Sequence, residues 1–204
     1  MSVILGAKTY EYIFIAGDSR NYSSNGTFTD DNSKVFEVNN NLAFAGAGNC
    51  AFVNGVFRKL LESEDKENFT TEDIFEIAKV EYILTKAACS LKKLIDKNFI
   101  DTSASCCCFI AGLNKGNEAK LLFAYDKDEQ GYLTCFEVQT MITPPEGMAV
   151  DKCFEILEKN FREHAYDFPQ RTIRDIARLN SFVSSSGEAW IFNLANRCGK
   201  LESF

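Results

Sequence analysis

The sequence predicts an α+β layered domain, and three observations lead to this fold class. Segments with strand or helix periodicity come in the order strands, two helices, strands, two helices and a last strand. This order differs from the regular strand–helix alternation of a doubly wound parallel sheet. The chain has 204 residues, of which 46% are hydrophobic, and no repeat or low-complexity linker divides it, so we expect one domain over 1–204.

Four strands are expected near the start of the chain. The short apolar runs 3–9 and 11–18 nearly touch in the sequence, as the strands of a hairpin do. The polar stretch 21–33 is rich in Ser, Asn, Asp and Gly and predicts a loop with at most a weak strand. A second pair of strands is expected at 34–38 and 42–47.

Two helices are expected next. Apolar residues from Phe52 to Leu61 recur at helical spacing and predict the first helix. Thr70, with Asp73 three residues later, predicts a capping box at the start of a longer second helix. The single apolar stripe expected on that helix consists of Ile74, Ile77, Leu84, Ala88, Leu91 and Ile95.

The second half of the chain returns to strands and then to helices. Three strands are expected at 104–113, 119–125 and 133–138. Two helices follow at about 148–161 and 169–179, and a last strand is expected at 188–195. Pro169 suits the first turn of the fourth helix, where its missing N–H costs nothing.

Charge and hydropathy limit the classes of function. The formal net charge is −7, and the sequence contains no cluster of Lys and Arg. Nucleic acid is therefore a poor candidate partner. No run of 18 apolar residues predicts a membrane span, and the first ten residues lack the pattern of a signal peptide. We therefore expect a cytoplasmic protein.

The eight cysteines do not predict a metal site. None belongs to a C-x-x-C pair, and the chain has one histidine, His164, so zinc ligands are poorly supported. Cys106, Cys107 and Cys108 are consecutive in an expected strand, where neighbours face opposite sides and cannot converge on one metal. We expect these thiols to be small buried hydrophobes in a reducing compartment.

Ser2, Asp18 and Lys34 are separated by two equal steps of sixteen residues. A serine hydroxyl is a weak nucleophile until a base takes its proton, and a free terminal amine, with a pKa of about 7.7–8.0, can be that base. A lysine ammonium beside the amine lowers this pKa further, and a carboxylate can hold the lysine in place. The nitrogen of Ser2 becomes such an amine only when Met1 is removed, which the small size of serine favours.

These residues and their neighbours resemble the start of a catalytic β-type proteasome subunit, or of its bacterial ring-protease relative. The flanking sequences are Gly17-Asp18-Ser19-Arg20 and Ser33-Lys34-Val35-Phe36. The resemblance is sharp over residues 2–48, and in element order it covers nearly the whole chain. It implies an N-terminal nucleophile hydrolase with a four-layer α-β-β-α sandwich, in which two antiparallel sheets lie between two helix pairs.

The resemblance also implies an activity and its catalytic residues. Ser2, after loss of Met1, would hydrolyse peptide bonds in unfolded proteins, while Asp18 holds Lys34 and Lys34 tunes the amine. In the small-residue turn 45–48, Gly46 would donate its N–H to the oxyanion if the preceding turn is two residues shorter than usual. Without that shortening the matching residue is Gly48.

Further positions match the family's substrate pocket and its supporting residues. Asn21, Asn32 and Phe44 correspond to residues that line the pocket for the residue before the cut, which implies an uncharged pocket and a preference for small or neutral side chains. The positions that would support the site are Arg20, Ser186 and Gly187. The resemblance implies no metal or organic cofactor. It implies a homo-oligomeric ring as the assembly, with an ATP-driven unfoldase as a possible partner.

Two departures from the family pattern leave an alternative open. The segment 143–148 has no serine where family enzymes carry one before the third helix. Val183 stands where they carry an aspartate, three residues before the Ser186-Gly187 pair. A catalytically inactive structural or assembly subunit is therefore the second hypothesis, and an amidase that acts on small amides is a third.

Overall fold

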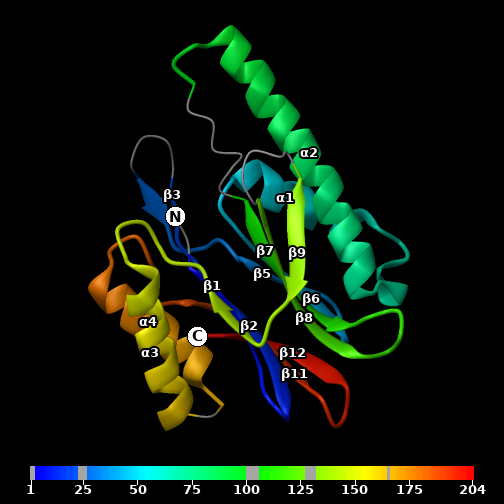
Figure 1. The fold of residues 1–204 in the computed structure, drawn as a ribbon, viewed down its shortest axis with the longest axis vertical. Coiled ribbons are helices and arrows are strands. Elements are labelled where there is room, and N and C mark those ends of the chain that lie inside the picture. The colour runs from blue at the N-terminus through cyan, green and yellow to red at the C-terminus, as the bar shows by residue number, and fades with distance from the viewer. Residues whose placement is uncertain (1–2, 23–26, 100–105, 127–131, 165) are drawn as a thin grey trace.

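Two five-stranded antiparallel sheets and a small two-stranded ribbon form the framework of this computed structural model (Figure 1). The structure describes residues 3–22, 27–99, 106–126, 132–164 and 166–204. The first sheet has the order β10-β1-β2-β11-β12. Its strands are β1 (Ile4–Lys8), β2 (Tyr12–Asp18), β10 (Thr140–Ile142), β11 (Gly187–Asn193) and β12 (Cys198–Ser203).

The second sheet has the order β5-β6-β7-β8-β9, and each strand pairs with its neighbour in the sequence. Its strands are β5 (Val35–Asn39), β6 (Leu42–Ala47), β7 (Cys107–Leu113), β8 (Ala119–Asp126) and β9 (Leu133–Glu137). The ribbon consists of β3 (Asn21–Tyr22) and β4 (Phe28–Thr29).

Four α-helices follow the strands in two pairs. They are α1 (Cys50–Glu62), α2 (Thr71–Ile95), α3 (Val150–Glu163) and α4 (Phe168–Leu179), and a short 3-10 helix, η1 (Lys66–Asn68), separates α1 from α2. The side chain of Asn49 accepts the N–H of Ala51 at 2.9 Å and caps α1. The predicted capping box of α2 is confirmed: the backbone N–H and the hydroxyl of Thr70 both donate to the carboxylate of Asp73, at 3.0 and 2.6 Å.

Three groups of buried apolar residues hold these elements together. Trp190 and Phe109 belong to the group between the two sheets. Phe14 and Phe168 belong to the group that joins the first sheet to α3 and α4. A third group, which includes Tyr82, joins the second sheet to α1 and α2. Burial of apolar surface in these groups is the main favourable contribution to folding.

The predicted four-layer sandwich with a helix pair as each outer layer is wrong, whereas the coarser α+β class is correct. The structure has two antiparallel five-stranded sheets but few helices, and these do not form two complete layers. The last turns of α2, from Ser90 to Ile95, are exposed, and this end of the helix projects beyond the second sheet (Figure 1). The ribbon of β3 and β4 also lies outside both sheets.

The single apolar stripe predicted for α2 is also wrong in its second half. Ile74 is buried as expected, but Leu84, Leu91 and Ile95 are 56%, 60% and 87% exposed. The buried face at that level is formed instead by Tyr82, Thr85 and Cys89, with other residues of the same helix side. Helical spacing defines which residues share a face, but it does not say how far the sheet extends beneath them.

Two strands of the first sheet were not expected. β10 is only three residues long, and β12 has the sequence Cys-Gly-Lys-Leu-Glu-Ser, which lacks clear alternation. β12 nevertheless pairs with β11 along its full length and covers that edge of the sheet. Within the described part of the chain, no helix combines the length and the apolar character needed to cross a membrane.

Candidate functional site

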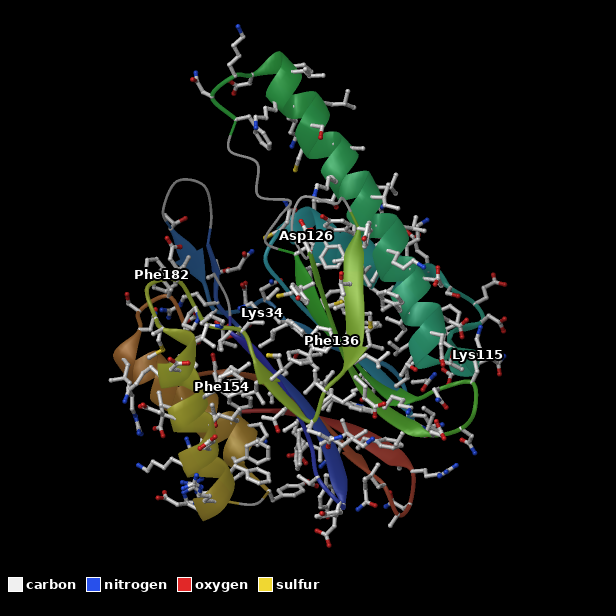
Figure 2. The ribbon with its side chains drawn as sticks, in the orientation of Figure 1. Lys34, Lys115, Asp126, Phe136, Phe154 and Phe182 are labelled. Carbon is white, nitrogen blue, oxygen red and sulfur yellow. The ribbon has the colours of Figure 1, made fainter. Side chains whose placement is uncertain are left out.

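A buried ion pair joins the end of β2 to the residue before β5. The Nζ of Lys34 donates to Oδ1 of Asp18 at 2.8 Å and to the backbone carbonyl of Arg20 at 2.6 Å. The side chain of Lys34 is 5% exposed and that of Asp18 is 0% exposed. Lys34 is labelled in Figure 2, and the Oδ1 atom of Asp18 that it contacts also accepts the N–H of Val3, the first described residue. The structure therefore brings together two of the three residues on which the sequence hypothesis rests.

Backbone N–H groups surround the carboxylate of Asp18. Oδ1 accepts the N–H of Val3 at 2.9 Å, and Oδ2 accepts the N–H of Arg20 at 3.0 Å and that of Ser184 at 3.3 Å. The N–H of Asp18 in turn donates to the carbonyl of Val3 at 3.2 Å. Four donors, counting Lys34, thus fix the carboxylate in one position, and the first described residue of the chain is held against it.

The pKa of the Lys34 ammonium lies below its ordinary value of 10.5. Burial is the larger cause, because it removes water from the charged form. The negative charge of Asp18 opposes this shift and keeps it from growing. A lysine with a lowered pKa and a fixed counterion can influence the protonation of a neighbouring amine.

Met1 and Ser2 lie outside the described residues, so the predicted nucleophile has no described position. What the structure gives is the position of Val3, the residue covalently bound to Ser2. Both backbone polar groups of Val3 are hydrogen-bonded to Asp18. The chain therefore enters its first strand beside the Asp18–Lys34 ion pair.

The assignment of Gly46 as oxyanion donor is wrong in this structure. Its N–H donates to the backbone carbonyl of Lys34 at 3.0 Å, within the pairing of β5 and β6, and it is not available to another acceptor. Gly48 lies just after β6 with φ of +98°, a conformation that suits glycine. Within the described residues its N–H has no hydrogen-bond partner. The alternative assignment, Gly48, therefore stays a prediction that its unengaged N–H permits.

Two of the three predicted pocket residues line a small cavity of about 30 Å³ beside Lys34. Asn21 and Asn32 line it together with Gly48 and Cys50. The thiol of Cys50, at the start of α1, donates weakly to Oδ1 of Asn21 at 3.7 Å. Lys34 is the one formally charged side chain among the lining residues that the structure describes, so the lining is otherwise neutral.

The assignment of Phe44 to this pocket is wrong. Its side chain is fully buried in the group beneath α1 and packs edge-on against Phe57, with ring centroids 5.6 Å apart. Phe44 stands two residues before Gly46 in β6, and unlike Gly46 it is not among the residues that line the small cavity.

A larger cavity of about 260 Å³ touches the other side of the ion pair, and sequence reasoning did not predict it. Three acidic residues, Asp30, Asp31 and Glu188, contribute to its lining along with Asp18 and Lys34. The carboxylate of Glu188 accepts a hydrogen bond from the hydroxyl of Ser33. The ion pair therefore lies between a small, largely neutral cavity and a larger acidic one.

Arg20, just after β2, connects the segment that follows β4 to the segment that follows α4. Its guanidinium bonds both carboxylate oxygens of Asp30 at 2.7 Å and donates to the carbonyl of Ser181 at 2.6 Å. It also lies 4.0 Å from the centre of the Phe28 ring. These hydrogen bonds hold the pKa of Asp30 below its ordinary value of 3.8, against a smaller opposing effect of burial. The contacts agree with a supporting role for Arg20.

A chain of three hydroxyls lies next to Asp18. The Oγ of Ser186 is 2.8 Å from that of Ser19 and 2.8 Å from that of Ser184. Gly187 pairs directly with Asp18 across β2 and β11, and a Cβ at this glycine would lie 2.2 Å from the carbonyl oxygen of Gly17. Ser184 was not predicted as a site residue, and no local motif marks it.

At both positions where the sequence departs from the family pattern, the side chains contact the body of the fold. Val183 is 2% exposed and packs in the apolar group beside α4. In the segment 143–148, the hydroxyl of Thr143 bonds the N–H and the carbonyl of Ile4, at 3.0 and 3.2 Å, and so serves β1. Neither position offers a polar group in the way that the family pattern requires.

A comparison of the chain with models of known protein families gave no match, and a comparison with curated proteins gave none either. Within the described residues, no three side chains of His, Cys, Asp or Glu are grouped closely enough to hold a metal ion. The features of the described chain that bear on function are therefore the ion pair, the hydrogen-bonded Val3 and the two cavities beside them.

Proposed function

We propose that the chain is an N-terminal-nucleophile peptidase of the proteasome β type, in which Ser2 is the nucleophile after removal of Met1. The observation that carries the proposal is the buried Asp18–Lys34 ion pair, against which Val3 is hydrogen-bonded. Burial of a lysine is costly unless a counterion compensates it, as Asp18 does here, so the pair is retained at some cost to stability. An amine and a hydroxyl on the residue before Val3 would complete a nucleophile–base unit with that lysine.

The reaction requires no group beyond those of the chain, the peptide and water. The free amine of Ser2 takes the hydroxyl proton as Oγ attacks the scissile carbonyl, and the resulting oxyanion accepts the N–H of Gly48. The protonated amine then gives its proton to the leaving amine, which breaks the peptide bond and leaves an ester on Ser2. Water, deprotonated by the same amine, attacks the ester and regenerates the hydroxyl.

Lys34 and Asp18 act on this unit through charge and position. The Lys34 ammonium lowers the pKa of the neighbouring amine and stabilises the alkoxide as it forms. The carboxylate of Asp18 keeps that ammonium charged despite its burial, and it also anchors Val3. The 30 Å³ cavity is small and, apart from Lys34, has an uncharged lining, which favours substrates with a small, uncharged side chain before the cut.

The test is hydrolysis of unfolded casein by protein whose first residue is Ser2. We expect cleavage that is lost in Ser2→Ala and reduced on the order of 100-fold in Lys34→Ala. Ser90→Ala, on the exposed side of α2, is the matched control and should retain full activity. Cuts that follow mainly Lys, Arg, Asp or Glu would contradict the assignment of the small cavity.

A catalytically inactive structural or assembly subunit is the second candidate function. It is favoured by the buried apolar side chain of Val183 and by the engagement of Thr143 with β1. Under this hypothesis, protein with a free Ser2 amine folds normally but cleaves no casein and no small amide. Hydrolysis of small amides without cleavage of casein would instead indicate an amidase.

The site of action and the assembly are part of the same proposal. All eight cysteines are free thiols, which agrees with a reducing cytoplasm. A homo-oligomeric ring and an ATP-driven unfoldase follow from the resemblance to proteasome subunits alone. Sedimentation of the processed protein tests the ring, since a ring of identical subunits has a defined mass several times that of one chain.

A further inference from the structure

A cavity of about 520 Å³ opens where the turn between β1 and β2 meets the end of α3. These two segments lie at the same end of the molecule (Figure 1). Four of the six residues that line the cavity are aromatic, and the lining consists of Thr9, Tyr10, Glu11, Tyr12, Phe161 and Tyr166. We call these six residues the tyrosine groove. None of them lines either cavity of the proposed peptidase site, so the groove requires a separate explanation.

The rings of the tyrosine groove lie at steep angles to one another and remain open to solvent. Tyr12 and Tyr166 are nearly perpendicular, with an interplanar angle of 81° and ring centroids 5.7 Å apart. Tyr166 also packs edge-on against the buried Phe14, which supports it from the side of the sheet. Phe161 and Tyr166 are 45% and 47% exposed, and Tyr10 is fully exposed. Aromatic rings in such an arrangement can surround an organic cation and attract it with their negative faces.

The charges around the tyrosine groove favour a positive ligand. Glu11 is the one formally charged residue of the lining, and within the described residues its carboxylate has no ion-pair partner. Burial raises the pKa of Tyr166, the charge of Glu202 raises it further, and Lys200 opposes this with a smaller effect. Lys200 is itself paired with Glu202 at 3.1 Å. The neighbouring charges therefore make the potential at Tyr166 negative, which attracts cations.

The chain's own cations do not occupy these rings. Elsewhere a Lys or Arg lies over an aromatic ring, as Arg20 does over Phe28 at 4.0 Å and Lys79 over Phe75 at 5.3 Å from the ring centre. Within the described part of the chain, no Lys or Arg lies in this way over a ring of the tyrosine groove. The faces of these rings are therefore accessible to a cation from outside.

The hydrogen-bonding groups of the groove select the type of cation. The hydroxyl of Thr9 already accepts the N–H of Glu11 at 3.2 Å and that of Tyr12 at 2.9 Å. A primary ammonium gives up three hydrogen bonds to water when it is buried, and Glu11 is the one ionised acceptor in the lining that could replace them. A quaternary ammonium has no N–H and gives up none. Aromatic faces and a single carboxylate therefore suit a quaternary ammonium best.

We propose that the tyrosine groove binds the quaternary ammonium group of a small molecule. The three tyrosines and Phe161 surround the methyl groups of the ligand, and Glu11 is its counterion. This binding is independent of the proposed peptidase activity, so Ser2→Ala should bind the ligand as the wild-type chain does. Loss of one function in an experiment therefore leaves the other to be tested separately.

Isothermal titration calorimetry with choline tests the proposal, and 3,3-dimethylbutan-1-ol is the matched control ligand. This alcohol has the shape of choline, with a carbon atom in place of the charged nitrogen. We expect saturable one-to-one binding of choline with a Kd on the order of 1 mM, and binding of the alcohol that is about tenfold weaker, because the rings attract the charge. Equal binding of the two ligands, or no saturation by choline, would overturn the proposal.

Variants that keep the groove apolar separate the attraction of the rings from simple packing. Tyr166→Leu should weaken the binding of choline about tenfold and change that of the alcohol little. Glu11→Gln should weaken choline binding about threefold at low salt and less at high salt. Tyr132→Leu is the matched control, since this tyrosine is 53% exposed outside the groove, and it should leave binding unchanged.

Circular dichroism checks that the variants remain folded. Choline binding that neither Tyr166→Leu nor Glu11→Gln weakens would place the ligand elsewhere on the molecule and contradict the assignment of the groove.

Discussion

The Nζ of Lys34 lies 2.8 Å from Oδ1 of Asp18, and both side chains are almost entirely shielded from water. The pair connects the end of β2 to the start of β5 and therefore links the two sheets. The same carboxylate accepts the N–H of Val3, so the start of the chain, the ion pair and the sheet packing depend on one another. Loss of either charge should affect folding as well as activity.

Asp18→Asn is expected to destabilise the fold by about 3–5 kcal/mol, because it leaves the buried Lys34 ammonium without a counterion. Urea denaturation measures this difference directly. The control is the double variant Asp18→Asn/Lys34→Met, in which no buried charge remains. We expect it to be more stable than Asp18→Asn alone, and equal stability of the two would argue against a charged Lys34.

The pH dependence of hydrolysis should have two limbs. The rate rises as the Ser2 amine loses its proton, at or below the ordinary pKa of about 7.7–8.0. It falls again as Lys34 loses its proton, and because burial lowers the pKa of Lys34, this descending limb lies below pH 10.5. Rates of peptide cleavage between pH 5 and 11 provide the measurement.

Asp18→Asn tests the assignment of the descending limb. The carboxylate of Asp18 raises the pKa of Lys34, so its neutralisation should move the limb to lower pH in whatever residual activity remains. Lys34→Met should remove the limb altogether. A descending limb that stays at the same pH in both variants belongs to another group.

Folding stability should fall as the pH rises above about 9. Burial raises the pKa of Cys106 from 9.0 to about 12 and raises that of Cys108 well above 9.0. Above pH 9 the unfolded chain loses these protons while the folded chain keeps them, so alkali favours unfolding, by up to about 1.4 kcal/mol per pH unit for each thiol. Lys34 has the opposite sign, because its folded pKa is lowered, and it offsets only part of this loss.

Urea midpoints at pH 8 and pH 10.5, under reducing conditions, measure the alkaline loss. Cys106→Ala/Cys108→Ala should show a smaller difference between the two midpoints than the wild-type chain. Cys50→Ala, which removes an exposed thiol, is the matched control and should leave the difference unchanged. An unaltered difference in the double variant would show that these thiols are not the cause.

Ser186→Ala should reduce kcat about tenfold, equivalent to about 1.4 kcal/mol, because it interrupts the hydroxyl chain next to Asp18. The cost in folding stability should be only about 1 kcal/mol, typical of one hydrogen bond. Steady-state kinetics and urea denaturation separate the two effects. Ser203→Ala, an exposed serine that lines the same acidic cavity, is the control and should change neither.

Periodicity and cap chemistry predicted most helices and strands, but not how they are layered. The Thr70–Asp73 capping box could be predicted because it depends on residues three apart. The exposure of Leu84 and Leu91 could not, because it depends on where the second sheet ends beneath α2. β12 was missed for a similar reason: its pairing with β11, and not its own alternation, makes it a strand.

The part of the site that the sequence predicted correctly is the contact between Asp18 and Lys34, because the positions of these residues in the chain follow from the strands beside them. Asp18 and Lys34 each lie at one end of a strand, at the level where the two sheets pack, and they meet as an ion pair. Gly46 and Phe44 were misassigned, because strand pairing uses the N–H of one and α1 covers the ring of the other. The acidic cavity and Ser184 combine segments far apart in the chain, and no local motif marks them.

The most direct test of the central claim is the intact mass of the protein purified from cells, before and after incubation with a peptide epoxyketone. This reagent requires a hydroxyl nucleophile and a free amine on the same residue. We expect a mass that lacks Met1 and gains one inhibitor, and no labelling of Ser2→Ala. Protein that lacks Met1 but forms no adduct would contradict the assignment of Ser2 as a live nucleophile.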